Sequence, residues 1–534
     1  MNFNKLRFLL SLLFLFTTSL VTLAQEAPKP NWQNLDYATD SVMGISVNKA
    51  YSEILKGKKS TPVIVAVLDG GVDINHEDLK RIIYKDKKER INGKDDDHNG
   101  YVDDINGWNF LGNGSKDINY ETLELVRQIR KLEKKFSRMQ MDSASRANDP
   151  EYKKLMLMEA DFQKQYAEAI NNFSGISGFK DVLDEMEYKI GKDSLNLQGF
   201  TNFTPSEPGE AQVKKVVLNV LTEGDMDYAT FKETEIDDAY DHYYQKLNYN
   251  LNIHYNPRVE LRINDHTRFY GNNHVTGPDA LHGTHVAGII AADRKNKIGI
   301  KGVADNVKIM GVRTVPNGDE RDNDVANAIR YAVDNGAKII NMSFGKSYSD
   351  NKKIVDDAVK YAVSKDVLLI HAAGNDNNNL DTDKNFPNKT YEDGSGVASS
   401  WLEVGASGPL NDESLKASFS NYGKTTVDVF APGVDIYSTT PNSTYRSLDG
   451  TSMASPVVSG IAALIRSYYP NLTANQVKQI IMDSSVKVSH PVSVVVDKNP
   501  VEINFSDLSI SGGVANAYTA LKMADDISKG TASE

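Results

Sequence analysis

Ser452 is the serine whose surroundings best suit a nucleophile. Residues 449–465 read DGTSMASPVVSGIAALI, and this run of small and then apolar residues predicts a buried helix with Pro456 near its first turn. Ser452 would lie at or just inside the helix N-terminus, where unpaired backbone N–H groups and the positive end of the dipole gather. A hydroxyl there could attack a carbonyl carbon, and the resulting oxyanion would find donors. An ordinary N-cap of a buried helix explains these residues equally well.

Two further stretches supply the groups that such a serine needs. Residues 63–73, VIVAVLDGGVD, predict a central parallel strand with Asp69 at its carboxyl end, where open α/β sheets place their sites. Residues 281–292, LHGTHVAGIIAA, predict a small-residue helix that His282 opens. Asp, His and Ser in this chain order, each at the end of an element, match one of the known orders of a serine triad.

The same motifs resemble those of the subtilisin-like serine proteases. GTSMASP at 450–456 is similar to the nucleophile motif of that family, HGTHVAG at 282–288 to its histidine motif, and AAGN at 372–375 to its oxyanion-asparagine motif. The resemblance covers residues 63–110 and 274–523 but not the segment between them. It implies peptide-bond hydrolysis by Asp69, His282 and Ser452, with Asn375 as an oxyanion donor and no cofactor needed for catalysis.

The resemblance also implies where a substrate would bind. Ser343, Phe344 and Gly345 would form an edge along an extended protein or peptide substrate, and Ala373 and Gly374 would line the same site. Residues 318–321 would flank the substrate on its other side. The acidic residues Asp319, Glu320 and Asp322 near that rim hint at tolerance for basic side chains.

Three nearby residues call for a separate interpretation. His285 lies one turn beyond His282, but no Glu stands between them as in a zinc-protease helix, so we expect His285 to be structural. His371 fits a strand-end histidine better than a second base. Gly70 follows Asp69 where the family more often has Ser or Thr, and we expect backbone N–H groups to support the carboxylate instead.

An acidic loop follows the first strand. Residues 92–104 read NGKDDDHNGYVDD, in which Asp95, Asp97 and Asn99 alternate, Gly100 allows a sharp turn and Asp103 or Asp104 closes the loop. This approximates the first half of an EF-hand loop. The pattern makes calcium a candidate structural cofactor, with a solvated acidic turn as the alternative. The candidate ligands are Asp95, Asp97, Asn99, Asp103 and Asp104.

The composition narrows the class of protein and the cellular compartment in which it works. The chain of 534 residues has a net charge of −12 and no cysteine. The charge argues against non-specific nucleic-acid binding, and the absence of cysteine excludes disulfides, thiolate zinc sites and cysteine proteases. A basic start, an apolar run at 8–16 and small residues at 22–24 predict a signal peptide, with a membrane anchor as the alternative. We expect an exported protein, periplasmic or secreted, whose mature form does not span a membrane.

The fold class follows from strands that alternate with helices between 307 and 372. This order predicts an α/β, subtilisin-like parallel sheet with helices on both faces. Helical spacing recurs between the catalytic Asp and His and predicts a large insertion of five or six helices, at 121–141, 152–170, 179–190, 213–221 and 228–247 among others. This insertion could restrict access to the cleft. Residues 251–262 are expected to be irregular or an edge strand, and residues 487–511 a less regular surface segment.

The predicted organisation has five parts. They are a signal peptide at 1–24, an N-terminal segment at 25–59, a peptidase domain at 60–111 and 274–526, an inserted helical subdomain at 112–273 and a C-terminal tail at 527–534. The N-terminal segment is either a short pro-segment or part of the mature fold. We expect an exported serine endopeptidase that works through an acyl-enzyme, or alternatively an inactive binding protein that acts through the insertion. The sequence predicts neither side-chain specificity nor oligomeric state.

Overall fold

The chain forms two compact units in a computed structural model that describes residues 28–139, 142–223, 226–265, 267–496 and 498–530. We call Leu125–Tyr255 the helical unit, and Pro28–Glu124 with Asn256–Glu534 the sheet unit. The predicted signal peptide lies outside the described residues. Within the described ranges, no helix is both long and apolar enough to cross a membrane.

A nine-stranded sheet is the centre of the sheet unit. Its order is β12 (Val486–Lys487), β15 (Gly513–Val514), β9 (Val429–Pro432), β8 (Trp401–Ser407), β7 (Leu368–Ala372), β6 (Ile339–Met342), β1 (Val63–Asp69), β5 (Val307–Arg313) and β2 (Gly107–Asn109). All neighbours pair in parallel except β12 and β15. The inner strands are buried on both faces, which explains their continuous apolar runs. The predicted α/β parallel sheet is confirmed.

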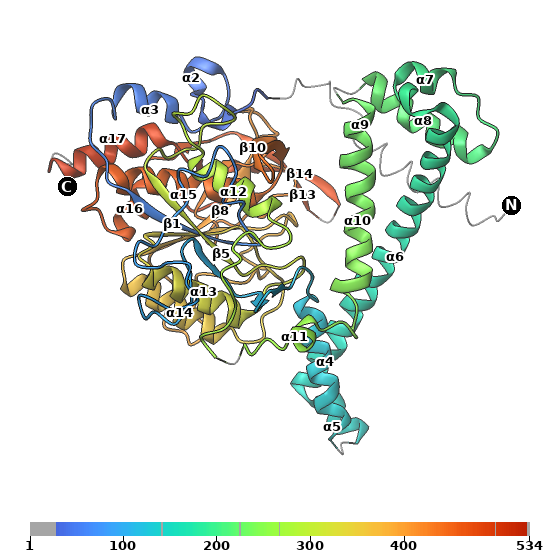
Figure 1. Cartoon of the computed structure of the whole chain (residues 1–534), viewed down its shortest axis with the longest axis horizontal. Coiled ribbons are helices and arrows are strands. Elements are labelled where there is room, and N and C mark those ends of the chain that lie inside the picture. Colours follow the sequence, from blue (N-terminus) through green and yellow to red (C-terminus); the bar gives the residue numbers. More distant parts are fainter. Residues whose placement is uncertain (1–27, 140–141, 224–225, 266, 497, 531–534) are drawn as a thin grey trace. The chain divides into compact units, whose positions relative to one another are not determined.

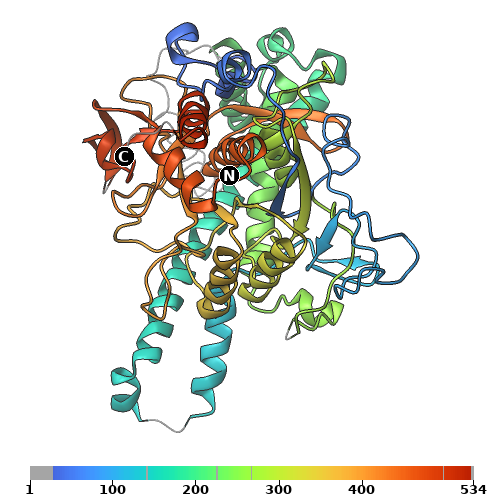
Figure 2. The same cartoon turned by 90° about the vertical axis from the view of Figure 1, so that its left-hand side faces the viewer.

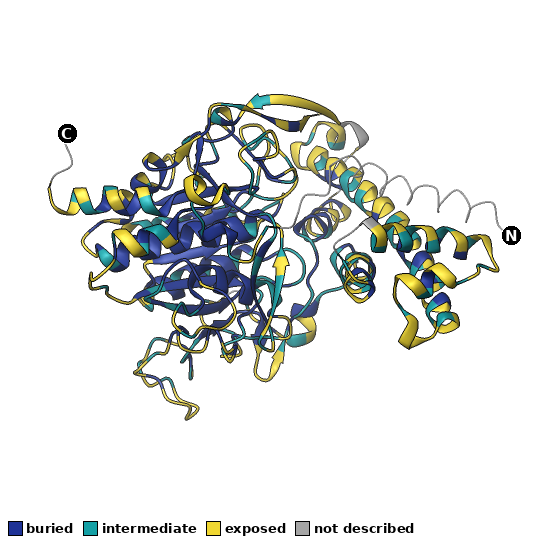
Figure 3. Ribbon diagram, turned by 90° about the horizontal axis from the view of Figure 1, so that it is seen from above, coloured by how far each residue is buried: buried dark blue, intermediate teal, exposed yellow. Residues whose placement is uncertain are grey.

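Helices cover both faces of this sheet (Figures 1 and 2). On β1, Val65 and Val67 join the core with α12 (Leu281–Ala291) and α15 (Thr451–Tyr468). Ala66 and Leu68 point the other way, into the core with α13 (Asp322–Asp334) and α14 (Lys352–Ser364). α16 (Ala474–Asp483) and α17 (Ala517–Ser528) pack beside α15. Figure 3 shows the buried strands between partly exposed helices.

The start of α15 differs from the expectation in one respect. Pro456 lies inside the helix, in its second turn, and not in the first turn where a missing N–H is harmless. A residue at this position would normally donate to the carbonyl four residues earlier, which belongs to Ser452. The Ser343 hydroxyl donates to that carbonyl instead, at 2.9 Å. The proline therefore leaves an acceptor on Ser452 that ties α15 to the end of β6.

The N-terminal segment packs into the core of the sheet unit. It contains η1 (Trp32–Asn34), α2 (Tyr37–Asp40) and α3 (Val47–Glu53). Trp32 is completely buried, and its indole N–H lies 3.1 Å from the carbonyl oxygen of Val434. Ile45 belongs to the same core as α15, and its carbonyl accepts the Ala517 N–H at 2.7 Å. These contacts join the segment to distant parts of the sequence.

The helical unit confirms the predicted large insertion of helices. Its elements are α4 (Glu124–Ser137), α5 (Ser143–Asn148), α6 (Pro150–Ile190), η2 (Lys192–Ser194), α7 (Leu197–Asn202), α8 (Pro208–Glu223), α9 (Tyr228–Phe231), the π-helical turns η3 (Lys232–Asp237) and η4 (Lys246–Asn250), and α10 (Asp238–Gln245). α6 merges the helices predicted at 152–170 and 179–190. The side chain of Asp149 caps its start, and Pro150 occupies its first position, where proline is tolerated. Phe179, Leu183, Phe200 and Phe231 form the core of this unit.

Two stretches differ from the expectation of an irregular segment or an edge strand at 251–262 and of a less regular segment at 487–511. Residues 251–262 contain α11 (Pro257–Leu261). Residues 487–511 contain a hairpin of β13 (Pro491–Val496) and β14 (Asn499–Asn504), followed by η5 (Phe505–Asp507). Two further pairs are β3 (Gly112–Asn113) with β4 (Lys116–Asp117), and β10 (Ile436–Thr440) with β11 (Thr444–Leu448).

Candidate active site

Asp69 and His282 contact each other at the carboxyl end of β1. Asp69 is the last residue of the strand, His282 is the second residue of α12, and both carboxylate oxygens lie 2.9 Å from His282 Nδ1. The Gly70 N–H donates to Asp69 Oδ1 at 2.7 Å, which confirms that a backbone group supports this carboxylate. A Cβ on Gly283 would lie 2.2 Å from the Gly71 carbonyl oxygen, so only glycine allows α12 to approach this closely.

The carboxylate also sets the electrostatics of the imidazole. Burial alone lowers the pKa of His282, but the charge of Asp69 and its hydrogen bond outweigh burial and raise the pKa above its usual 6.5. The hydrogen bond to Asp69 favours a proton on Nδ1, which leaves Nε2 as the nitrogen that can accept one. His282 therefore has the arrangement of a general base.

The hydroxyl of Ser452 is held by Ser343. Ser452 is the second residue of α15, and its Oγ donates to the Ser343 carbonyl oxygen at 3.1 Å. Among the residues described here, no hydrogen bond joins Ser452 to His282. In enzymes without substrate, catalytic hydrogen bonds are often long or misaligned and form fully only in the complex. The structure thus brings Asp69 and His282 together and leaves the serine hydroxyl on another acceptor.

Asn375 lies beside the start of α15. Its Oδ1 accepts the Thr451 backbone N–H at 2.9 Å and the Thr451 hydroxyl at 2.8 Å. Its Nδ2 has no hydrogen-bond partner within the described part of the chain. Asn375 Nδ2 and the Ser452 backbone N lie 3.4 and 3.5 Å from one point, the position that a Cβ on Gly450 would occupy. Two free donors therefore face the same space next to Ser452, as an oxyanion hole requires.

A buried asparagine that the sequence analysis missed is hydrogen-bonded to three serines beside this site. Asn341 is the third residue of β6 and has no exposed surface. Its Nδ2 donates to Ser343 Oγ at 3.0 Å, and its Oδ1 accepts the hydroxyls of Ser455 at 3.0 Å and Ser459 at 2.7 Å. An amide within the apolar run of a predicted buried strand was the available signal, since a buried polar group needs partners.

The predicted substrate-binding residues follow two adjacent strands. Ser343, Phe344 and Gly345 come after β6, and Ala373 and Gly374 come after β7. A Cβ on Gly345 would lie 2.5 Å from Asn385 Oδ1, and Asn385 Nδ2 donates to the Ala373 carbonyl oxygen at 3.0 Å. Asn385 therefore links the two segments.

The acidic residues at 319–322 do not form an exposed rim. Glu320 and Asp322 are buried. Lys346 Nζ, also buried, lies 2.7 Å from the Glu320 carbonyl oxygen and 2.8 Å from the Asp322 carboxylate. Asp319 Oδ2 accepts the Glu124 backbone N–H at 2.7 Å. The suggestion that these acids favour basic substrate side chains therefore loses its support.

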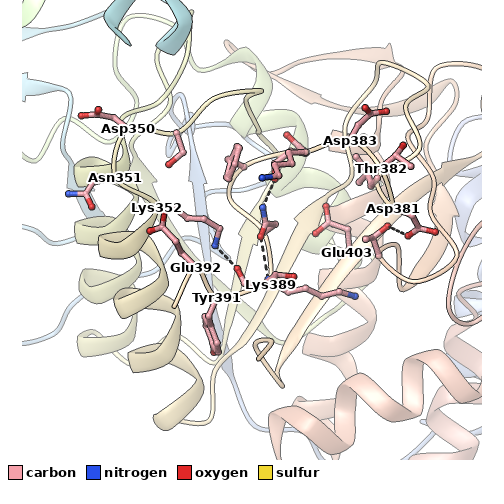
Figure 4. Close-up of a pocket in the computed structure, with 18 residues that line it drawn as sticks. Asp350, Asn351, Lys352, Asp381, Thr382, Asp383, Lys389, Tyr391, Glu392 and Glu403 are labelled. Atoms are coloured by element: carbon pink, nitrogen blue, oxygen red, sulfur yellow. Dashed lines mark hydrogen bonds between the residues drawn. The ribbon is translucent and has the colours of Figure 1, made fainter. Parts of the chain in front are cut away.

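Asn385 is one of the residues that line a cavity of about 580 Å³, which Figure 4 shows with its labelled charged residues. Its lining includes Asp350, Lys352, Asp381, Lys389, Tyr391 and Glu403. Lys389 is paired with Asp428 at 3.0 Å, and Thr425 donates to Asp381 at 2.8 Å. Lys389 is therefore neutralised by an ion pair, and Asp381 is held by a hydroxyl donor.

The acidic loop contains a cluster that differs from the predicted ligand set. Oxygens of Glu89, Asp95 and Asp97 lie within 4.8 Å of one another. Asp103 points elsewhere, because its carboxylate accepts the N–H groups of Asn92 and Gly93. Glu89 was missed because it precedes the alternating acidic motif by six positions and contributes no spacing signal of its own.

Asp104 adds an unpaired oxygen next to this loop. Its Oδ2 accepts Tyr331 OH at 2.6 Å and Asn99 Nδ2 at 3.1 Å, whereas its buried Oδ1 has no hydrogen-bond partner. Burial, together with the charges of Glu89 and Asp97, raises the pKa of Asp104 to about 6 despite the two donors. Asp104 is not part of the cluster of Glu89, Asp95 and Asp97, whose converging carboxylate oxygens suit a hard divalent cation.

The two other histidines of interest are buried. His285 Nε2 lies 3.0 Å from the Arg446 carbonyl oxygen, and burial lowers the pKa of His285 to about 3, so its ring stays neutral. His371 Nδ1 lies 2.8 Å from Glu403 Oε1 inside the sheet. Neither ring contacts Asp69 or Ser452 through a hydrogen bond among the described residues. Both environments fit structural roles.

Most of the chain matches one protein family. Residues 60–506 match the model of the subtilase family. Over 209 residues the chain is 42% identical to a thermophilic serine proteinase of Bacillus sp. (strain AK1), which covers 39% of this chain and 47% of that protein. It is also 42% identical over 209 residues to thermitase of Thermoactinomyces vulgaris, covering 39% of this chain and 68% of thermitase. The chain thus spans about half the length of the first of these relatives and two thirds of the second.

A solved structure is similar as well. It is that of proteases from Pseudoalteromonas arctica PAMC 21717, with 30% sequence identity and coverage of 46% of this chain and 70% of that one. The TM-score of this match is 0.37.

Proposed function

The chain belongs to the subtilase family, and we propose that it is a serine endopeptidase that hydrolyses peptide bonds through an acyl-enzyme. The observation that carries this proposal is the pair formed by Asp69 and His282, with both carboxylate oxygens 2.9 Å from Nδ1. The helix start at Ser452, with donors from Asn375 and its own backbone on one side, adds the second half of such a site. Protein or peptide substrates follow from this activity.

The mechanism begins with rotation of the Ser452 hydroxyl from Ser343 to His282 Nε2. As Oγ attacks the substrate carbonyl, Nε2 takes its proton, and Asp69 stabilises the imidazolium through Nδ1–H. The carbonyl oxygen becomes an oxyanion that accepts from Asn375 Nδ2 and the Ser452 N–H. His282 then gives the proton to the leaving amine. A water deprotonated by His282 attacks the ester, and Ser452 regains its proton as the acid product leaves.

A fluorophosphonate probe tests the role of Ser452. The probe should label the wild-type protein and Ser447→Ala, which removes an exposed serine five residues earlier, but not Ser452→Ala. Loss of cleavage of an internally quenched peptide in Ser452→Ala alone would support endopeptidase activity. Labelling that persists in Ser452→Ala would refute the assignment.

We also propose a structural calcium ion at the acidic loop. Glu89, Asp95 and Asp97 would hold it, since their oxygens already converge. Three carboxylates held this close repel one another unless a cation lies between them, which supports an ion at this point. The ion would stabilise the loop that leads into β2 and has no part in the steps above.

The N-terminal segment is proposed to be part of the mature fold. The burial of Trp32 and Ile45 in the main core supports this over a removable pro-segment. We propose export as well, to the periplasm or the medium, on the sequence of residues 1–24. N-terminal sequencing of secreted wild type and Ser452→Ala should give the same start near residue 25. A wild-type start near residue 60, with the longer form retained in Ser452→Ala, would overturn the first proposal.

A second candidate is an inactive binding protein that acts through its helical unit. The exposed apolar side chains on α6, among them Leu157 and Tyr188, favour a partner-binding role. The ends of the insertion meet within the sheet unit, where Arg258 Nε lies 3.7 Å from Glu121 Oε2, so a short linker can replace Leu125–Tyr255. A shortened protein that still hydrolyses peptides supports the peptidase. Probe labelling that is absent in wild type supports the binding protein.

A further inference from the structure

The loop that carries Asn375 is held on both sides by one buried side chain, that of Asn421. The loop spans residues 373–378 after β7, and Asn421 lies in the segment between β8 and β9. Asn421 Oδ1 accepts the N–H groups of Asp376 at 3.1 Å and Asn378 at 2.7 Å. Its Nδ2 donates to the Ala373 carbonyl oxygen at 2.8 Å. The amide thus binds the backbone before and after Asn375.

Two further contacts bring Asn421 close to this loop. Its own backbone N–H donates to the Gly374 carbonyl oxygen at 2.9 Å. Gly374 has a φ of +104°, and a Cβ there would lie 2.5 Å from Asn421 Nδ2. Glycine at this position therefore serves the backbone conformation and also leaves room for the asparagine.

Asn377, in the same loop, is also held by residues just before Asn421 in the sequence. The buried Lys416 donates through Nζ to Asn377 Oδ1 at 2.7 Å, and the Asn377 N–H donates to the Phe419 carbonyl oxygen at 2.7 Å. Residues 416–421 thus pack against the loop. Within this segment, Asn421 makes the contacts nearest to Asn375.

We propose that Asn421 is a positioning residue for the oxyanion donor Asn375. This rests on the proposed function, in which Asn375 Nδ2 stabilises the oxyanion. Asn421 does not touch Asn375 through a side-chain hydrogen bond in the described structure. It fixes the backbone on either side of Asn375, while Thr451 orients the Asn375 amide through two hydrogen bonds to Oδ1. Preorganised donors act because they need no rearrangement as charge develops, and a loop free to shift would lose that advantage.

The test is a double-mutant cycle of Asn421→Ala and Asn375→Ala with an amide peptide substrate. Each kcat is calculated from the concentration of active sites titrated with a fluorophosphonate, so that unfolded protein does not lower the value. We expect Asn421→Ala to lower kcat by about tenfold or more with KM changed less than about twofold, the pattern of a lost transition-state interaction. In the Asn375→Ala background the same change should cost less than about twofold, because residues that act through one another are not additive.

Asn516→Ala is the matched control. Asn516 is also a buried asparagine, which accepts the Thr519 N–H at 3.0 Å and donates to Ser46 Oγ at 2.8 Å, and it caps α17. Its loss should lower Tm while kcat stays unchanged. If Asn421→Ala gives no titratable sites, Asn421→Ser, whose hydroxyl can still accept one N–H, takes its place in the cycle.

Three outcomes would overturn the inference while the proposed function stands. They are an unchanged kcat in the Asn421 variants, a kcat loss in Asn516→Ala as large as theirs, or losses at 421 and 375 that multiply in the double variant. An unchanged kcat in Asn375→Ala alone would instead refute the oxyanion assignment itself, and with it this inference.

Discussion

Ser343 and Ser452 exchange two hydrogen bonds. The Ser343 hydroxyl donates to the Ser452 carbonyl oxygen at 2.9 Å, and the Ser452 hydroxyl donates to the Ser343 carbonyl oxygen at 3.1 Å. The first bond exists because Pro456 cannot supply the helical donor for that carbonyl. The end of β6, where an extended peptide would pair, is thereby linked directly to the candidate nucleophile.

Replacing Ser343 should therefore disturb both stability and rate. Ser343→Ala leaves the Ser452 carbonyl without its donor near the start of α15, which should cost about 1–3 kcal/mol in the free energy of unfolding. We also expect kcat to fall several-fold because Ser452 is held less firmly. Thermal unfolding and peptide hydrolysis measure the two effects. Ser343→Thr keeps a hydroxyl and should recover part of both, and equal values for all three proteins would contradict this role.

The pH dependence of kcat/KM should reflect His282. Catalysis needs its neutral form, and Asp69 raises the pKa of His282 above 6.5, so activity should rise with pH through a value above 6.5. Asp69→Asn removes the charge that favours the imidazolium. The acidic limb of the residual activity should therefore move to lower pH, along with a large loss of kcat. A wild-type limb at or below 6.5, or no shift in Asp69→Asn, would count against the pairing.

Thr451 should act through the orientation of Asn375. Thr451→Val removes the hydroxyl that donates to Asn375 Oδ1 at 2.8 Å and accepts the Gly374 N–H at 3.1 Å. We expect a loss in kcat of about tenfold with little change in KM. Complete removal in Asn375→Ala should cost about 100- to 1,000-fold, the size known for one such donor in subtilisin, a member of this family. Thr451→Ser should restore the rate, and a normal rate in Thr451→Val would exclude this orienting role.

Calcium should stabilise the protein through the acidic loop. Calcium at about 100 times its Kd would add about 2.7 kcal/mol to the free energy of unfolding, and a chelator should remove that gain. Differential scanning calorimetry with calcium or chelator measures the shift in Tm. Glu89→Gln and Asp97→Asn should shrink it.

Asp103→Asn serves as the control for this prediction. Its carboxylate bonds to the backbone N–H groups of Asn92 and Gly93 and not to the cluster, so the calcium-dependent shift should persist. A shift lost in Asp103→Asn but kept in Glu89→Gln would favour the ligand set predicted from sequence. A wild-type Tm that changes with neither calcium nor chelator would refute the proposed calcium site.

Trp32 should matter to the stability of the whole sheet unit. It is completely buried, and its indole N–H also lies 3.2 Å from the Asp435 carbonyl oxygen. Trp32→Ala should lower the free energy of unfolding by about 3–5 kcal/mol, as for other large-to-small core changes. Tyr37→Ala, at an exposed residue of α2, should have little effect. A small loss in Trp32→Ala would show that the segment is not needed once the sheet has folded.

The sequence predicted the parallel sheet and family membership because their signals are local. A buried strand needs a continuous apolar run, and Asp69 ends such a run. His282 and Ser452 stand at the starts of helices whose small and apolar residues are also visible in the sequence. The helical insertion was predictable for the same reason, although α6 is one helix and not two. At 251–262 and 487–511 the hydrophobic spacing was too weak to predict the helix and the hairpin, which tertiary contacts stabilise.

The sequence by itself determined which chemical groups the protein has and at which element ends they lie, because residue type and periodicity are properties of neighbouring positions. Only the tertiary structure decided what holds them. Asn421 reaches the Asn375 loop from 43 to 48 positions away, and Asn341 binds Ser455 and Ser459 across more than 110 positions. The fold of the backbone also brings the Glu89 carboxylate next to those of Asp95 and Asp97. Such contacts depend on how distant strands and loops pack, and no local spacing encodes that.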